Sequence, residues 1–413
     1  MKKKINRINK LLAGVILPLV IMASLFGCKD EANKTLQANA TVGTDEINTQ
    51  VMTPEVTTEE ETEAKFIPPE IKVIMVGDVL LHDRVEKCAL QEDGSYDYNQ
   101  IFAFLEKDIK AANLAIVNQE VIIGGEELGI SGYPCFNASY TMADALSKAG
   151  FDVVCHGTNH ALDKGKKGLL NCMANWKAKY PDMAVLGINE SEEEYNDIYV
   201  YEQEGVKIAV LNYTYGTNGI KLPSDMPYAV DMLEEEKVVA DIKKAEQIAD
   251  FTIVCPHWGT EYVLKETEEQ RRWAQIFLEN GVDLVIGTHP HVIEPIEMLK
   301  DENTGHQMLV YYSIGNFVNW TGEEGKGVSN RMIGGMAEIN ISKNEKGEVY
   351  IKDFGVTALV SHLTGGTNGV TTMKLCEYTE ELAEANKITE QDSTFSRKHC
   401  IEICNEVWGD YWE

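Results

Sequence analysis

His289 and His291 flank a proline directly after a short apolar run, residues 284–286. The run has the composition of a buried strand, and Gly287 and Thr288 then release the chain into a loop. Residues i and i+2 of an extended segment point to the same side, and the proline biases His289 towards extended dihedral angles. We therefore expect both imidazoles to face one spot just past the carboxyl end of a strand, where α/β sheets bind ligands. Taken alone, the pair could equally be two loop histidines bonded to backbone or water.

Four other apolar runs end in residues of the kinds that bind divalent cations. These residues are Asp78 after the run from Ile71, Glu120 after the run 111–117, Asn159 and His160 after the run 151–155, and His257 after the run 250–255. One such strand end is common, but five in one chain are hard to obtain by chance. We therefore expect a shared metal site, and its predicted ligands are Asp78, Glu120, Asn159, His160, His257, His289 and His291.

The types of these residues indicate which ions and which chemistry to expect. Imidazole, carboxylate and amide groups together suit Mn, Fe or Zn better than Ca. Seven candidate ligands exceed the needs of one ion, so we expect two ions bridged by a shared carboxylate. A pair about 3.5–4 Å apart would activate a water and clamp an oxyanion. Beyond any ligation, His257 and His289 would stabilise charge or transfer a proton, and Asn159 joins them as an expected catalytic residue.

The elements that must position these residues alternate along the chain. Apolar runs at 206–211 and 308–313 add two more predicted strands, the second followed by Gly315 and Asn316. Helical patterns separate several of the strands, at 140–149, 166–179, 233–248 and 268–280. Strands alternating with helices imply βαβ units, a largely parallel sheet and the α/β class.

Charge bears on the substrate and on the partners. The formal charge is −29 and the sequence has no basic stripe, so we expect no nucleic-acid partner. An anionic substrate would need a cation or local positive side chains. We expect Asn316, Arg84 and Arg331 to contact it. Asn316 could instead cap a turn, and the two arginines could be ordinary surface charges.

Residues 1–27 are expected to be a lipoprotein signal peptide. Cations at positions 2, 3, 4 and 7 precede an apolar run at 11–26, and Gly27 precedes Cys28. This order is typical of an export signal. The residues from Leu25 to Cys28 resemble a bacterial lipobox, after which Cys28 would carry the lipid. An uncleaved anchor is the alternative, but the run is shorter than the roughly 20 residues that a membrane span needs. We expect an extracytoplasmic protein, lipid-anchored at the cell membrane.

The rest of the chain divides into three parts. Residues 28–70 are rich in Thr, Glu, Asn and Ala and have no apolar periodicity, which predicts a disordered tether. Residues 71–365 hold the motifs and form the expected body. Residues 366–413 are too few for a separate catalytic domain, so we expect a helical extension that packs on the body.

Six motifs in order along the body carry a family resemblance. They are Val76-Gly-Asp-Val-Leu-Leu-His82, Asn118-Gln-Glu120, Thr158-Asn-His-Ala161, His257-Trp-Gly-Thr-Glu261, Gly287-Thr-His-Pro-His291 and Tyr312-Ser-Ile-Gly-Asn-Phe317. They resemble the CapA family of capsule-synthesis proteins, which is linked to poly-γ-glutamate. The resemblance implies a four-layer α/β sandwich of the metallo-dependent phosphatase type, similar to calcineurin-like metallophosphoesterases. It also implies Asp78 as the first metal acid and Glu120 as the bridging carboxylate.

Two positions depart from the pattern of the metallophosphoesterases. Leu80 stands where their Asp-x-His motif has its histidine, and Glu120 stands where they have a bridging aspartate. One metal would therefore be held more weakly or differently, with His82 as a substitute ligand. Phosphodiesterase activity does not follow from the resemblance.

Three functions are consistent with these features. The leading prediction is a membrane-tethered, metal-dependent hydrolase that cleaves a phosphoester or an amide of an anionic polymer, in the synthesis or processing of capsule or poly-γ-glutamate. The alternative is a non-catalytic component of a polymer synthesis or export complex, with the proteins of that complex as partners, which Leu80 favours. A γ-glutamyl amide hydrolase or transferase would share the fold and change the bond. The chain has no Gly-x-Ser-x-Gly elbow, P-loop or dinucleotide fingerprint, which argues against serine hydrolases and nucleotide enzymes.

Overall fold

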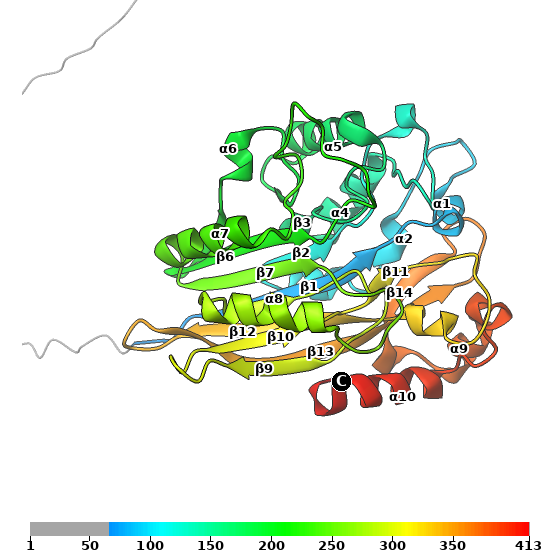
Figure 1. Ribbon diagram of the computed structural model, residues 1–413. Coiled ribbons are helices and arrows are strands. Elements are labelled where there is room, and N and C mark those ends of the chain that lie inside the picture. Colours follow the sequence, from blue (N-terminus) through cyan, green and yellow to red (C-terminus); the bar gives the residue numbers. More distant parts are fainter. Residues whose placement is uncertain (1–65, 413) are drawn as a thin grey trace, which may run out of the picture. The chain divides into compact units, whose positions relative to one another are not determined.

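Two β-sheets lie face to face at the centre of the computed structural model, which describes residues 66–412 (Figure 1). The first sheet has the order β14-β13-β12-β1-β2-β3-β4, with β11 paired to β1. Its strands are β1 (Glu70–Val79), β2 (Leu114–Asn118), β3 (Val153–Cys155), β4 (Ala184–Leu186), β11 (Asn316–Val318), β12 (Ile333–Lys343), β13 (Val349–Leu363) and β14 (Val370–Lys374). The second has the order β5-β6-β7-β8-β10-β9. Its strands are β5 (Tyr199–Gln203), β6 (Val206–Thr214), β7 (Phe251–His257), β8 (Leu284–Ile286), β10 (Gln307–Tyr311) and β9 (Ile296–Lys300).

Every predicted apolar run forms a strand, but the strands divide between two mixed sheets. β1, β2, β3 and β4 are parallel neighbours, and so are β6, β7, β8 and β10. The antiparallel strands β12, β13 and β14 extend the first sheet, and β5 and β9 close the edges of the second. The expectation of one largely parallel sheet was therefore wrong. A buried run indicates a strand but does not tell which sheet the strand joins.

Side chains of the second sheet alternate between two hydrophobic cores. On β6, Ala209 and Leu211 pack with the helices α7 (Glu235–Ile248) and α8 (Glu268–Glu279), whereas Ile208 and Val210 face the core shared with the first sheet. This is the period of two that a strand imposes. The first sheet has its own helices, because α4 (Thr141–Ala149), α5 (Gly165–Lys179) and α10 (Arg397–Trp408) bury apolar side chains in the same cluster as its strands. The expected four-layer α/β sandwich is confirmed.

Shorter helices complete the body. They are α1 (Asp83–Ala89), α2 (Asn99–Phe102), α3 (Glu106–Lys110), α6 (Glu192–Tyr195) and α9 (Glu380–Ala385). The segment from residue 366, where we expected helices alone, first supplies the edge strand β14 and then α9 and α10. The ring of Trp408 on α10 lies against Gly335 of β12, so the end of the chain is packed on the first sheet.

The expected signal peptide, the lipidation site Cys28 and most of the expected tether lie outside the described residues. Within residues 66–412, none of the helices combines the length and the apolar character needed to cross a bilayer.

Glycines let two strands of the first sheet approach closely beside the predicted site. A Cβ on Gly77 of β1 would lie 1.9 Å from the carbonyl oxygen of Gly315, which precedes β11. Only glycine fits such an approach. As a result Asp78 and Asn316 lie side by side in neighbouring strands.

Glu86 on α1 gives a stability test away from the predicted site. The side chain is buried, Tyr98 donates a hydrogen bond of 2.7 Å to Oε2, and Oε1 has no partner. Burial raises the pKa of Glu86 from 4.5 to about 8. The folded state therefore keeps a proton that the unfolded state loses, so stability falls as the pH rises from about 4.5 to about 8.

We expect Glu86→Gln to reduce that fall by an amount on the order of 1–3 kcal/mol, because glutamine keeps the acceptor for Tyr98 and never ionises. Thermal unfolding of wild type and variant at pH 5 and at pH 9, roughly the two ends of this window, measures the effect. The exposed Glu92→Gln is the matched control. Parallel pH profiles for wild type and Glu86→Gln would contradict the prediction.

Candidate metal centre

Strand ends from both sheets meet at one point. Asp78 ends β1 and Glu120 follows β2 in the first sheet, whereas His257 ends β7 and the loop after β8 carries His289 and His291 in the second. All five side chains are buried. Their ligand atoms form two groups with every atom within 4.8 Å of the others: Asp78, Glu120 and His291, and Glu120, His257 and His289. A set of this composition can hold divalent cations, with Glu120 shared.

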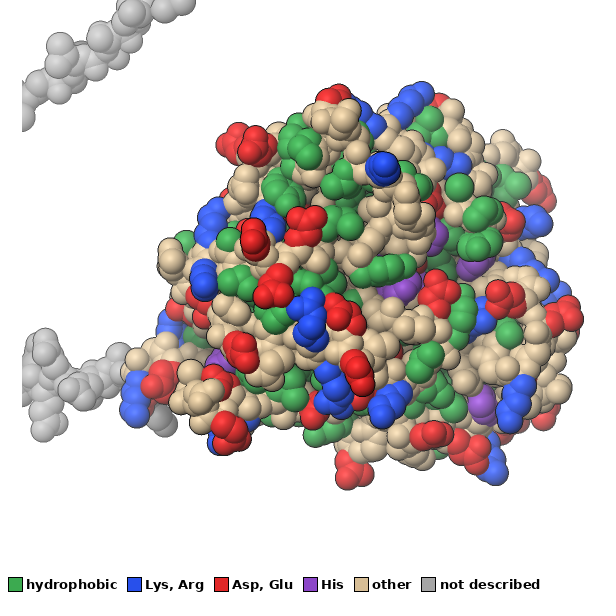
Figure 2. Space-filling view, viewed as in Figure 1, with side chains coloured by type: hydrophobic (Ala, Val, Ile, Leu, Met, Phe, Trp, Pro, Cys, Tyr) green, Lys and Arg blue, Asp and Glu red, His purple; other side chains and the backbone are tan. Residues whose placement is uncertain are grey.

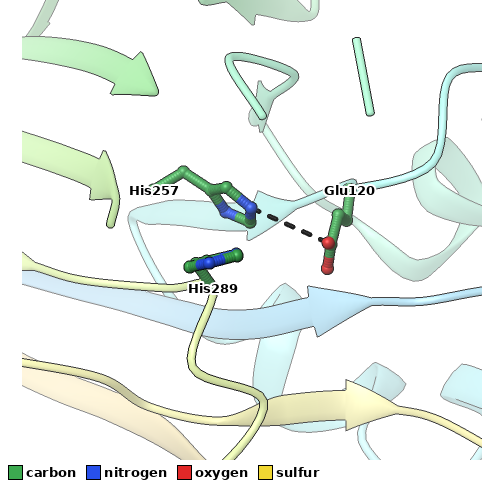
Figure 3. A group of neighbouring side chains, drawn as sticks. All are labelled: Glu120, His257 and His289. Carbon is green, nitrogen blue, oxygen red and sulfur yellow. Dashed lines mark ion pairs between the residues drawn. The ribbon is translucent and has the colours of Figure 1, made fainter. Parts of the chain in front are cut away.

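Glu120 belongs to both groups of candidate ligands, and its negative charge is the least compensated by hydrogen bonds. Both carboxylate oxygens are buried and neither has a hydrogen-bond partner among the described residues. Nε2 of His257 lies 3.7 Å from Oε1 (Figure 3), and Nε2 of His291 lies 3.7 Å from the same oxygen. These separations are too long for hydrogen bonds and leave room for an ion at about 2 Å from each atom. Burial raises the pKa of Glu120 well above its ordinary value. An orphaned buried carboxylate among imidazoles fits a cation.

Asp78 is held in place by groups from both sheets. Asn118 donates a hydrogen bond of 2.7 Å to Oδ1, and the backbone N–H of His289 donates one of 3.1 Å to Oδ2. Nδ1 of His291 lies 3.3 Å from the same Oδ2. The carboxylate is therefore oriented before any ion arrives.

His257 is oriented by neighbours on both ring nitrogens. Nδ1 lies 3.0 Å from the hydroxyl of Thr288, and Nε2 lies 3.0 Å from Oδ1 of Asn159. Burial lowers the pKa of His257 and of His289 well below the ordinary value, so both rings are neutral. Neutral imidazole is the form that binds a metal. Asn159 Oδ1 and His257 Nε2 face each other closely enough to bind one ion together.

The backbone at His289 and His291 differs from the extended loop that we expected. Their φ angles are 101° and 59°, in the left-handed region that non-glycine residues rarely adopt. The expectation of extended dihedral angles around Pro290 was wrong, yet the two ring centroids are 5.7 Å apart and both rings reach the cluster. Such conformations cost on the order of 1–3 kcal/mol each and persist where surrounding contacts impose them. The bond from the His289 N–H to Asp78 is one such contact.

Asn316 is bonded to His291 and to the backbone of Arg331. Its amide nitrogen donates to the backbone carbonyls of His291 and Arg331, each at 3.0 Å, and its Oδ1 lies 3.1 Å from Nδ1 of His291. These bonds orient His291, and the expected contact of Asn316 with a substrate stays a prediction. Burial lowers the pKa of His291, but the carboxylates of Glu120 and Asp78 outweigh it and raise the value to about 9. In the absence of an ion, this imidazolium is the positive charge at the centre.

His160 stands at the edge of the cluster. Its Nδ1 lies 2.7 Å from a carboxylate oxygen of Asp163, and its Nε2 lies 3.9 Å from Oε1 of Glu120. A carboxylate that orients an imidazole in this way is common beside metal ligands. Of the seven predicted ligands, the structure brings five into the two central groups and places Asn159 and His160 in contact with them.

A groove of about 870 Å³ opens beside the cluster, lined by Asn159, His160 and residues of several loops. Figure 2 shows histidine side chains in a hollow on one face, bordered by hydrophobic side chains. Arg84 lines the groove, where its guanidinium lies over the ring of Trp320 and donates to Gln391.

Arg331 is buried beside the same groove. Its guanidinium carbon lies 3.5 Å from the ring centroid of Tyr262, and Nη2 pairs with Glu323 at 2.6 Å; both partners line the groove. Nε and Nη1 have no partner among the described residues. Unused donors on a buried arginine suit an oxyanion.

Several residues outside the predicted ligand set shape the site. The sequence suggested Glu261 as a residue that orients His257, and it gave no role to Asn118, Thr288 or Asp163. Glu261 offers a carboxylate within reach of His289 and His291, and it also lines the groove. Asn118 and Thr288 orient Asp78 and His257. Glu261, Asn118 and Thr288 lie inside or beside the quoted motifs, which was the available signal. Asp163 follows His160 by three residues, and nothing in its neighbourhood singled it out.

Leu80 stands where the Asp-x-His motif of the metallophosphoesterases has its histidine. Its side chain is buried and has no atom that can bind a metal. His82, the suggested substitute, is only partly buried and lines the groove with its ring against Phe136. It is absent from each group of candidate ligands found within residues 66–412.

Comparison with known proteins agrees with the motifs. The family model of the bacterial capsule synthesis protein PGA_cap matches residues 72–321. The PGA biosynthesis protein CapA of Bacillus subtilis (strain 168) is 27% identical over 263 residues, which are 60% of this chain and 63% of that protein. The capsule biosynthesis protein CapA of Bacillus anthracis is 25% identical over 264 residues, 61% of each chain. The chain thus matches less than two thirds of the length of these relatives. The predicted resemblance to the CapA family is confirmed.

Solved structures show a weaker likeness. The NAD nucleotidase of Haemophilus influenzae has a TM-score of 0.45 at 12% identity, covering 84% of this chain and 64% of that one. A putative 5'-nucleotidase of Staphylococcus aureus has a TM-score of 0.44 at 16% identity, covering 70% and 54%. Nothing about the reaction follows from likenesses of this size.

We expect Glu120→Gln to separate metal binding from folding. Without metal, the variant should unfold at the wild-type temperature or above it, because a buried carboxylate without hydrogen-bond partners is removed and Asp78 remains beside the His291 imidazolium. Its affinity for Mn²⁺ or Zn²⁺ should fall at least about tenfold, since even indirect partners of a metal are worth that much. Thermal unfolding with chelator and with added metal measures both effects. The exposed Glu345→Gln should behave as wild type, and an undiminished metal-induced shift in Glu120→Gln would contradict the assignment.

Proposed function

The chain belongs to the family of bacterial capsule synthesis proteins defined by PGA_cap, and from this premise we propose that it acts on an anionic polymer of the cell envelope as a metal-dependent hydrolase. The polymer would be capsule material, poly-γ-glutamate or a related chain, and the bond a phosphoester or an amide. The observation that carries the proposal is the buried Glu120 carboxylate, which has no partner of its own and faces two imidazoles at 3.7 Å.

Two divalent cations fit the donor set best. Asp78, Glu120 and His291 form one group, and Glu120, His257 and His289 form the other, with Asn159 in contact with His257. Imidazole and carboxylate ligands suit Mn, Fe or Zn. A pair of such ions supplies an activated water and a clamp for the oxyanion of the transition state.

The chain's own side chains orient this chemistry. Asn118 orients Asp78 by a hydrogen bond, and Thr288 does the same for His257. Since His257 and His289 are kept neutral by burial, they serve the reaction by ligation and by holding charge in place more readily than by donating protons. Asn159 lies between His257 and the groove, because its Oδ1 contacts the His257 ring and the residue lines the groove wall.

Arg331 is the best candidate for binding an anionic group of the substrate. It carries two unused donors, it is buried against Tyr262, and its partners line the groove. Arg84 is a second candidate, although its Nη1 already donates a hydrogen bond to Gln391. An acidic protein can bind an anion in this way because the anion contacts the local positive charge of the guanidinium group, whatever the net charge of the protein.

We further propose that the protein works outside the cytoplasm, held at the cell membrane by a lipid on Cys28. The charged start, the apolar run and Gly27-Cys28 support this location. The expected tether of residues 28–70 would separate the body from the membrane. Proteins of polymer synthesis or export would be its partners there.

A non-catalytic role in a polymer synthesis or export complex is the second candidate. Leu80 favours it, because a buried leucine stands where a ligand of related enzymes would be. In that case the ions would stabilise the body without turnover.

Metal analysis and hydrolysis assays on the purified chain distinguish the two candidates. We expect bound Mn, Fe or Zn and hydrolysis of either a phosphodiester or poly-γ-glutamate, and we expect His289→Ala to abolish turnover. His306→Ala, a histidine bonded to the backbone of Val282 outside the cluster, is the control. Stoichiometric metal without turnover on either substrate would favour the structural component. Absence of bound metal would overturn both.

Arg331→Met tests the recognition of an anion. If Nε and Nη1 bind the substrate equally before and during the reaction, KM should rise about tenfold while kcat changes little. Arg331→Lys should recover only part of the affinity, because lysine lacks the planar pair of donors. The exposed Arg272→Met serves as the control. Unchanged KM in Arg331→Met would remove this residue from the substrate site.

A further inference from the structure

A second cavity of about 440 Å³ lies between the edges of the two sheets. Strand β4 of the first sheet and strand β6 of the second contribute opposite walls, and residues of α5 and α6 close it. It shares no lining residue with the groove of the metal centre. A ligand here would therefore occupy a site of its own.

The cavity has a partly buried acidic side chain without an ion pair. Four acids line it. Glu194 pairs with Lys177, and Asp241 accepts bonds from Lys237 at 2.6 Å and from the Tyr213 hydroxyl at 3.0 Å. Asp197 is exposed to water. Asp231 differs, because its side chain has no lysine, arginine or histidine within ion-pair distance among the described residues.

Among the described residues, the side-chain donor to the Asp231 carboxyl is the amide of Asn189, at 3.0 Å. Asp231 is partly buried. Desolvation raises its pKa to about 7, although the bond from Asn189 and the more distant charge of Lys237 act in the opposite direction. A cation in the cavity would compensate the charge of Asp231.

Aromatic side chains make up much of the remaining wall. They are Trp176, Tyr180, Tyr195, Tyr199 and Tyr213. Rings of this kind attract cations over their faces. One of these rings already makes such a contact, since the ammonium of Lys237, which does not line the cavity, lies 4.3 Å from the ring centroid of Tyr195.

We propose that this cavity binds a small organic ammonium ion, with its charge against Asp231 and its carbon substituents against the aromatic wall. Aromatic rings favour a large, weakly hydrated cation over a hydrated metal ion. In agreement, none of the candidate metal-ligand groups in residues 66–412 includes a residue of this cavity. The site does not depend on the proposed hydrolase function.

Calorimetric titration with choline tests the proposal, and 3,3-dimethylbutan-1-ol is the matched neutral probe because it has the shape of choline without the charge. We expect choline to bind and the alcohol to bind at least about tenfold more weakly, which corresponds to loss of the charge and cation–π interactions. Equal affinity for the two compounds, or absence of choline binding, would overturn the proposal.

Two variants locate the site. Asp231→Asn keeps an acceptor for Asn189 and removes the charge, so choline affinity should fall at least about tenfold. Tyr199→Leu removes an aromatic wall and should weaken choline several-fold while leaving the neutral alcohol largely unaffected. The exposed Glu234→Gln, three residues from Asp231, is the control for a change of surface charge. Wild-type affinity in both Asp231→Asn and Tyr199→Leu would also overturn the proposal.

Glu120→Gln should bind choline as wild type does. This outcome separates the cavity from the metal centre, so that failure of one proposal leaves the other standing. Choline binding that disappears with Glu120→Gln, in a variant that unfolds at the wild-type temperature, would mean that choline occupies the metal groove and would refute the cavity as its site.

Discussion

The burial of Glu120 without a hydrogen-bond partner is the constraint on which the site depends. A carboxylate removed from water needs compensation, and the described residues provide only imidazoles at distances that an ion would bridge. The neighbouring Asp78 is buried as well, but it accepts hydrogen bonds from Asn118 and from the backbone of His289. The contrast indicates that the space around Glu120 is shaped for a ligand.

The two sheets share the work of building this space. The first supplies the carboxylates, and the second supplies His257, His289 and His291. Close contact between β1 and β11 requires glycine at Gly77, and the loop after β8 holds two histidines at positive φ. Strain of this kind is typical of positions where the placement of a side chain matters more than local stability.

Two other acids with raised pKa values show what is particular to the metal centre. Burial raises the pKa of Glu86 to about 8 and that of Asp231 to about 7. Glu86 has a tyrosine partner and stands alone in a helix, which is a structural arrangement. Asp231 lines a cavity with aromatic walls, which suits an organic cation. Glu120 alone among these three is surrounded by metal-ligating side chains. Removing a carboxylate from water is unfavourable at all three positions, and the neighbouring side chains decide whether the position is structural, suits an organic cation or suits a metal ion.

The sequence by itself determined the strands, the main helices and the chemical types at the site. Apolar runs ending in Asp78, Glu120, His257 and His289 were readable because buried strands are continuous in sequence and their polar ends follow at once. Long helices such as α5 and α8 were readable for the same reason of local periodicity. The family motifs were local as well, each within a few residues.

Only the tertiary structure decided how these parts meet. It divided the strands between two sheets and placed Asn316 against His291. It also placed Arg331 against Tyr262, gave His289 a backbone that Pro290 does not favour, and gave His291 a positive φ. These outcomes depend on contacts between residues far apart in the chain, such as the bond from the His289 N–H to Asp78. Local propensity carries no information about such contacts, because their energy arises only when the sheets have packed.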